Sequence, residues 1–171
     1  MFIDESGFYL LPTVVRTYGP KGMTPLMKAP FTKDHLSTMC GISTTGHLYS
    51  LSRAEPLSSY DTVAFIHHLQ LCIKGKLLLI WDGSPIHRGD VVKKYLEQGG
   101  AAKIHIEPLP PYAPDLNPAE GVWNQLKLRE MRNLCCMDLH HLHSELSMAI
   151  ERLRTKPSII QGFFARFRLS L

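Results

Sequence analysis

An apolar run that ends in an acid constrains the fold of this chain more than any other feature: Leu77-Leu-Leu-Ile-Trp81 is followed directly by Asp82. Such a run is typical of a strand buried on both faces in the middle of a sheet. The sequence then predicts a helix over 90–98, closed by two glycines, and a short strand over 103–107. Strand, helix and strand in this order form a parallel pair, which predicts an α/β fold with Asp82 where a central strand opens into a loop.

The residues before this unit predict an antiparallel sheet followed by one helix. The pair Ser6-Gly7 reads as a turn between two short strands, and this places Asp4 at the end of the first strand. Residues 16–30, rich in Gly, Pro, Lys and Thr, predict a loop or a loose hairpin. The expected elements are strands over 1–4, 8–11, 35–42 and 47–51 and a helix over 58–73.

A proline-rich connection follows the second parallel strand. Five of the eleven residues from 108 to 118 are proline, so this segment is expected to be stiff and irregular. It leads into a helix in which Asn117 is the N-cap, Pro118 the first helical residue and Glu120 part of the first turn. This helix is expected to reach about residue 133, and two further helices are predicted over 138–154 and 157–169.

Three carboxylates thus fall at special places: Asp4, Asp82 and Glu120. Converging carboxylates hold Mg²⁺ or Mn²⁺ in proteins, and two such ions can activate an attacking oxygen and stabilise a leaving one. A second interpretation is equally compatible with the spacing, because Asp is a common turn former and Glu in a first helical turn complements the helix dipole. Two nearby acids are interpreted differently, Glu5 as an outward-facing side chain and Asp115 as a loop cap.

Ordered strings in the sequence resemble the catalytic core of mariner-type transposases and of their bacterial insertion-sequence relatives, the DDE superfamily endonucleases. They are FIDESGF at 2–8, IWDGSPIH at 80–87 and YAPDLNPAEGVW at 112–123, with a similar turn at 16–25. The resemblance covers nearly the whole chain. It implies an RNase H-like α/β fold, with a mixed five-stranded sheet flanked by helices, and a D-D-E triad of Asp4, Asp82 and Glu120.

The resemblance also implies an activity. In such enzymes the acids bind two divalent ions, Mg²⁺ or Mn²⁺; water attacks a DNA phosphodiester at the end of a mobile element, and the freed 3′-hydroxyl attacks target DNA. DNA is then the partner, and a homodimer in a synaptic complex is expected. His87 lies in one of the matching strings and is a secondary candidate that orients a phosphate or a metal-bound water, or simply stabilises its loop.

The net charge of +4 arises entirely after residue 120. Lys127, Arg129 and Arg132 are candidates for contact with DNA phosphates, although a solvated helix face explains them equally well. On a helix Lys127 and Arg129 point about 160° apart, so the three side chains do not face a single DNA strand.

Length and composition define the rest of the expectation. A chain of 171 residues suits one domain over 1–171. We expect this chain to lack the helix-turn-helix domain that precedes the catalytic core in full-length relatives, and a separate domain or chain to supply it. The four cysteines lack metal-binding or disulfide spacing and are expected to be reduced. The chain has no secretory signal and no apolar run of the roughly 18 residues needed to cross a membrane. We therefore expect a cytoplasmic protein, bacterial and nucleoid-associated by resemblance.

Two alternatives remain open at this point. One is another RNase H-like nuclease, with the same metal chemistry but a different nucleic acid as substrate. The other is a transposase-derived module that binds DNA or protein without catalysis.

Overall fold

The computed structural model describes residues 1–166 except 29, 31 and 112, and it is built on one five-stranded sheet. The strands lie in the order β3-β2-β1-β4-β5, so the first strand of the chain is the central one. Strands β1, β2 and β3 pair antiparallel, whereas β4 pairs parallel with β1 and β5 pairs parallel with β4. The strands are β1 (Phe2–Tyr9), β2 (His35–Ile42), β3 (Leu48–Arg53), β4 (Leu77–Trp81) and β5 (Ile104–Pro108).

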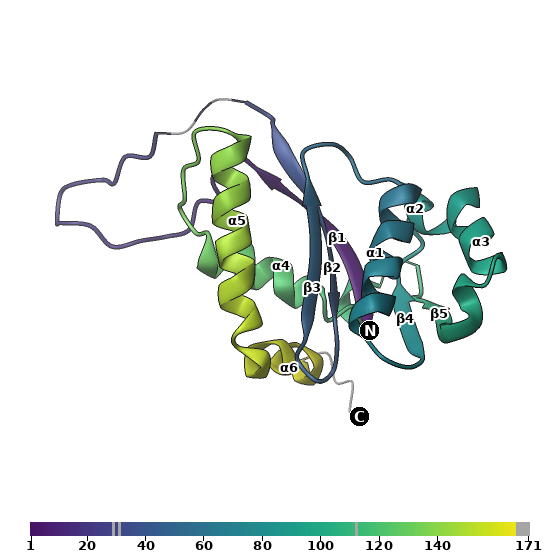
Figure 1. Ribbon diagram of the computed structural model, residues 1–171. Helices are drawn as coiled ribbons and strands as arrows, with labels where there is room; N and C mark the ends of the chain where they lie inside the picture. Colours follow the sequence, from purple (N-terminus) through teal and green to yellow (C-terminus); the bar gives the residue numbers. More distant parts are fainter. Residues whose placement is uncertain (29, 31, 112, 167–171) are drawn as a thin grey trace.

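Helices cover both faces of this sheet (Figure 1). On one face lie α1 (Ser59–Cys72), α2 (Pro85–Arg88) and α3 (Asp90–Glu97). On the other face lie α4 (Glu120–Gln125), its π-helical continuation η3 (Leu126–Glu130), α5 (Leu139–Arg154) and α6 (Pro157–Arg166). Two short 3₁₀ turns, η1 (Gly100–Lys103) and η2 (Pro114–Leu116), flank β5 and the proline-rich connection.

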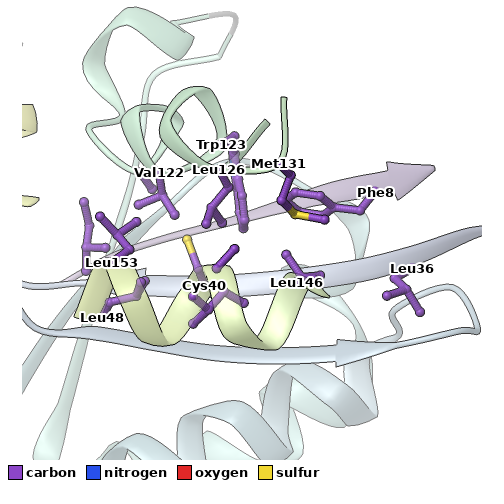
Figure 2. Packing of buried hydrophobic residues seen from close by; sticks show 14 of the residues in the cluster. Phe8, Leu36, Cys40, Leu48, Val122, Trp123, Leu126, Met131, Leu146 and Leu153 are labelled. Carbon is purple, nitrogen blue, oxygen red and sulfur yellow. The ribbon is translucent and has the colours of Figure 1, made fainter. Parts of the chain in front are cut away.

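Strand β1 separates two hydrophobic cores because successive side chains of a strand point to opposite faces. Phe2 and Phe8 pack with α4, α5 and α6, and Ile3 packs with α1 and the side of the sheet that α1 covers. Figure 2 shows the first core, in which Trp123 and Leu126 pack on the same side of the sheet as Cys40. By the same alternation, neighbouring residues Asp4 and Glu5 of β1 must point into different layers.

The predicted turn at Ser6-Gly7 is wrong. Strand β1 runs without interruption past both residues, in register with β2 from the pair Phe2 and Ile42 to the pair Tyr9 and His35. Glycine weakens a strand but does not break it where a long partner strand satisfies the backbone. Asp4 therefore lies inside a strand and not at its end.

The prediction that β4 is buried on both faces is also wrong. Leu77, Leu79 and Trp81 are buried, but the side chain of Leu78 on the other face is 47% exposed. Helix α5 packs against β2 and β3, on the far side of β1, and this leaves Leu78 partly uncovered. The strand, helix, strand order over 77–108 and its parallel pairing are confirmed.

The helix predicted from Pro118 to about residue 133 is shorter and divided. Helix α4 begins at Glu120, and from Leu126 the chain continues as a π-helical turn to Glu130. The side chain of Asn117 is buried and accepts a hydrogen bond from the backbone N–H of Ala119 at 3.2 Å. The N-cap of α4 is Ala119 and not Asn117 as predicted, because Pro118 and Ala119 form a turn ahead of the helix. Insertions of this π-helical kind occur frequently at functional sites.

The other helices match their predictions closely. Helix α1 starts with a capping box between Ser58 and Asp61, and the side chain of Asp138 caps α5 by accepting from the N–H of His141 at 2.7 Å. Helix α2, a single turn, was not predicted. Helix α6 is confirmed as far as Arg166; its predicted end lies outside the described residues.

All four cysteines are free. None of the helices among the described residues has the length and apolar character needed to span a membrane.

Gly121 offers a stability test of the contact between α4 and α6. A Cβ atom at Gly121 would lie 2.5 Å from Cγ of Phe163, closer than the packed helices permit. We expect Gly121→Ala to lower the free energy of unfolding by about 1–3 kcal/mol, since the two helices must separate. Gly162, in α6, has open space around its Cα, and Gly162→Ala is expected to raise stability by about 0.5–1 kcal/mol. Urea unfolding of both variants tests this, and equal stabilities would contradict it.

Candidate active site

Asp4, Asp82 and Glu120 line a single cleft of about 610 Å³. The strand register explains why the first two meet: Phe2 pairs with Ile80 on the adjacent parallel strand, so two residues later Asp4 and Asp82 stand at the same level. The proline-rich connection forms the opposite wall and brings in Glu120. The other lining residues are Gly83, Ser84, Arg88, Leu109, Pro110, Pro111, Ala113, Pro114 and Asn117.

Asp4 is the most enclosed of the three acids. It is only 9% exposed, and its Oδ2 accepts a hydrogen bond from the indole Nε1–H of Trp123 at 2.6 Å. Burial raises the pKa of Asp4 to about 7, and the hydrogen bond from Trp123 opposes this only in part. The negative charges of Glu120, Glu5 and Asp82 raise that pKa further. The cleft thus concentrates negative charge around a buried carboxylate.

Asp82 follows β4 at the mouth of the cleft, with 54% of its side chain exposed. Its Oδ1 accepts a hydrogen bond from the backbone N–H of Ser84 at 2.9 Å and lies 3.2 Å from Nδ1 of His87. Among the described residues no donor contacts Oδ2 of Asp82 or Oδ1 of Asp4. Each aspartate therefore has one oxygen held by the protein and the other free for a ligand in the cleft.

Glu120 enters the cleft from the first turn of α4. Its backbone N–H donates to the carbonyl of Asn117 at 3.1 Å, so the turn at the end of the proline-rich connection fixes where the helix starts. The Glu120 side chain is half-buried, and its carboxylate accepts no hydrogen bond from the part of the chain that the structure describes. The three acids together therefore present unpaired oxygens of the kind that Mg²⁺ and Mn²⁺ prefer.

His87 lies behind Asp82 and does not line the cleft. Its side chain is fully buried and stacks on Trp81 with the ring centroids 4.4 Å apart. Nε2 is 2.8 Å from Oε1 of Glu5, and Nδ1 is 3.3 Å from the backbone carbonyl of Asp82. Burial lowers the pKa of His87, but the hydrogen bonds and charges of Glu5 and Asp82 outweigh it and leave the pKa raised. Glu5 is accordingly an inward-facing partner of His87, contrary to the outward orientation expected for it.

The three basic candidates on and after α4 differ in their surroundings. Lys127 is half-buried: its Nζ donates to Oγ of Ser6 at 2.6 Å and lies 5.2 Å from the centre of the Phe8 ring. Burial lowers the pKa of Lys127, opposed by the nearby acids of the cleft. Arg129 and Arg132 are both exposed. Only Lys127 therefore stands close to the three acids.

Several residues of this site were missed at the sequence level. Trp123 lies in one of the matching strings, and a buried indole N–H generally needs an acceptor, which is the signal that was available. Arg88 lines the cleft from the end of α2, an element that the sequence did not predict. Cys40 pairs with Asp4 across β1 and β2; burial and the adjacent carboxylates raise the pKa of its thiol.

Comparison with known proteins shows a family and several similar solved structures. The model of the DDE superfamily endonuclease family matches residues 1–139. The Mos1 mariner paired end complex with Mn is similar, with a TM-score of 0.71 and 14% identity over 97% of this chain and 51% of that chain. The catalytic domain of Mos1 mariner transposase gives a TM-score of 0.60 and 13% identity over 98% of this chain and 78% of that one.

These similarities establish the fold. At 13–14% identity the solved structures share the architecture, which is RNase H-like, as the sequence resemblance implied. The chain spans about half the length of the Mos1 chains in the DNA-end complexes that it matches. No curated protein sequence matches it.

Proposed function

Because the chain belongs to the family of DDE superfamily endonucleases, we propose that it is the catalytic domain of a DNA transposase, which cleaves and joins DNA strands at the ends of a mobile element. One observation carries the proposal: three carboxylates from β1, the end of β4 and the start of α4 line one cleft. A turn former or a helix-dipole partner has no reason to meet two other acids, so this convergence favours the metal-binding interpretation.

The donor set fits divalent cations. Asp4, Asp82 and Glu120 would hold Mg²⁺ or Mn²⁺, and we propose two ions, as in the mechanism that the resemblance implies. Burial is the largest cause of the raised pKa of Asp4, and the negative charges of Glu120, Glu5 and Asp82 raise it further, which a bound cation would offset. Bound ions would lower the pKa of the attacking water and neutralise charge that develops at phosphorus. The protein itself keeps the ligands rigid, through Trp123 on Asp4 and through Ser84 and His87 on Asp82.

We propose DNA as the substrate, with basic residues positioning its phosphates. Arg88 on the cleft wall and Lys127 beside the acids are placed to contact the reacting strand, and the exposed Arg129 and Arg132 are placed to contact the flanking backbone. We extend the proposal to a single catalytic domain over 1–171 that pairs two element ends as a homodimer. A separate helix-turn-helix domain or chain would recognise the ends, and the bacterial cytoplasm, with its nucleoid, is the proposed location.

Metal titration combined with strand cleavage tests this function. We expect calorimetric titration to show Mn²⁺ binding to the purified chain, and plasmid nicking that EDTA abolishes. Asp82→Asn is expected to weaken both by at least about 100-fold, because it removes a direct ligand. Glu107→Gln, a largely exposed carboxylate on β5 outside the cleft, is the matched control and is expected to behave as the unmodified chain does.

The outcomes separate the alternatives. A folded chain that neither binds Mn²⁺ nor nicks DNA would favour the noncatalytic module. Cleavage of an RNA-DNA hybrid in preference to duplex DNA would instead identify another RNase H-like nuclease.

A further inference from the structure

The enclosed imidazole behind the cleft is the feature that the cleavage chemistry leaves unexplained. A fully buried histidine in contact with two carboxylates is costly to maintain unless the contacts serve a purpose. His87 is held on one side by the stacked ring of Trp81, and its own backbone N–H donates to the carbonyl of Ser84 at 3.1 Å. The ring therefore has a fixed place and a fixed orientation.

The two nitrogens of this ring contact different carboxylates. Nε2 is 2.8 Å from Oε1 of Glu5, while Nδ1 is 3.2 Å from Oδ1 of Asp82 and 3.3 Å from its backbone carbonyl. Ligand atoms of these three residues lie within 4.8 Å of one another, as they would in a metal site. A neutral imidazole has a single ring lone pair, however, and both ring nitrogens of His87 already face oxygen acceptors, which is the arrangement of a hydrogen-bonded ring. The contacts form a hydrogen-bonded chain from Glu5 through the ring to Asp82, and in the protonated ring both nitrogens donate to oxygens.

This chain decides which oxygen of Asp82 is available. Oδ1 accepts the backbone N–H of Ser84 at 2.9 Å and lies 3.2 Å from Nδ1 of His87, whose hydrogen bond goes to the backbone carbonyl of Asp82 at 3.3 Å. Oδ1 is therefore enclosed by the loop, and Oδ2 is left for the cleft. Glu5 stabilises the ring from the opposite side. Glu5 directly follows Asp4 in β1. The same strand therefore supplies the metal-binding carboxylate of Asp4 and, through Glu5 and His87, supports that of Asp82.

We propose that Glu5 and His87 are a positioning pair, which fixes the rotamer of Asp82 so that Oδ2 faces the cleft before any ion binds. The inference rests on the proposed function, since it assigns Asp82 a metal-binding role. Neither residue touches the ion or the DNA; both act through Asp82. Partners that orient a metal ligand in this way typically contribute about 10- to 100-fold to metal affinity or activity.

Two replacements of His87 separate positioning from packing. Asparagine places its amide near the position of Nδ1 and keeps a donor for Asp82, whereas glutamine places its amide near Nε2 and keeps a donor for Glu5 only. We expect His87→Gln to weaken Mn²⁺ binding to the DNA-free protein by about 10- to 100-fold, and His87→Asn to recover a large part of that loss. Calorimetry measures both, with circular dichroism to confirm folding. His67→Gln, on the exposed side of α1, is the matched control.

A merely structural histidine would give a different pattern. If His87→Gln and His87→Asn weaken Mn²⁺ binding equally, or not at all, while the unmodified chain binds Mn²⁺, the positioning role is overturned and the proposed function stands. If the unmodified chain binds no Mn²⁺, the proposed function and this inference both fall.

Glu5 provides the second test if the buried His87 variants do not fold. Glu5→Ala removes the acceptor at Nε2, and Glu5→Gln restores an oxygen there without the charge. We expect Glu5→Ala to weaken Mn²⁺ binding by about tenfold and Glu5→Gln to recover part of the loss. Equal Mn²⁺ affinities in Glu5→Ala and the unmodified chain would overturn the inference.

Discussion

Asp4→Asn is expected to abolish strand cleavage and, at the same time, to stabilise the metal-free protein at pH 8. The loss of activity, at least about 1,000-fold, follows because Asp4 is the most buried of the three acids and lies level with Asp82 on the adjacent strand. The gain in stability follows because the ionised form of Asp4 is disfavoured in the folded protein by burial and by its negative neighbours. A neutral side chain of the same size relieves both effects.

The sign of the pH dependence can be stated for this group. The pKa of Asp4 rises from 3.8 in the reference state to about 7 in the folded protein, so the folded state binds the proton more tightly. The penalty is absent below about pH 4, grows as the pH rises from 4 to 7, and is fully present above 7. We expect Asp4→Asn to be more stable than the unmodified chain by about 1–3 kcal/mol at pH 8, and by much less at pH 4.5.

Urea unfolding in EDTA at both pH values measures this difference in the free energy of unfolding. The contributions of the other titrating groups are the same in both proteins and cancel in the difference. Adding Mn²⁺ should reverse the order at pH 8, because the ion stabilises only the protein that binds it. Asp115→Asn, in the same cleft-forming connection but exposed, is the control and is expected to change neither stability nor cleavage. An Asp4→Asn protein less stable than the unmodified chain at pH 8 would show that the ionised carboxylate is a net stabiliser of the fold.

The positions of Asp82 and Glu120 were accessible from the sequence because each depends on local signals. An apolar run that ends in an acid places Asp82 after a strand, and Asn117-Pro118 places Glu120 at the start of a helix. Asp4 was expected at a strand end and lies within a strand, yet it still reaches the cleft. Asp4 reaches the cleft because β1 pairs with β4. Pairing between strands far apart in the sequence leaves no local signal in it.

The support around the acids was not accessible in the same way. Glu5 was expected to face outward, as a polar strand residue does in a sheet with one covered face. Here helices cover both faces of β1, so the side opposite Asp4 is a second interior, where Glu5 meets His87. Likewise the contact of Trp123 with Asp4 joins residues 119 positions apart. Contacts of this range arise from the packing of layers and not from any local pattern.

Trp123→Phe is expected to show how much of the site depends on a single N–H group. The substitution keeps an aromatic ring against Phe8, whose centroid is 6.0 Å away, but removes the donor that contacts Oδ2 of Asp4 at 2.6 Å. We expect a loss of about 1.5–3 kcal/mol of stability at pH 8, the usual range for a hydrogen bond to a charged group. Mn²⁺ binding should weaken by about 10- to 100-fold, because Asp4 becomes free to rotate.

A double-mutant cycle with Asp4→Asn separates this hydrogen bond from the packing of the indole. The smaller phenyl ring leaves unfilled space whatever residue stands at position 4, and that part of the loss cancels in the cycle. The part due to the charged contact does not cancel and appears as the coupling energy of the cycle. We expect this coupling energy to reach at least about 1 kcal/mol at pH 8 and to be smaller at pH 4.5, where Asp4 is protonated in the folded protein. A coupling energy of zero at pH 8 would mean that Trp123 only packs, and that β1 alone holds Asp4 in position for the ion.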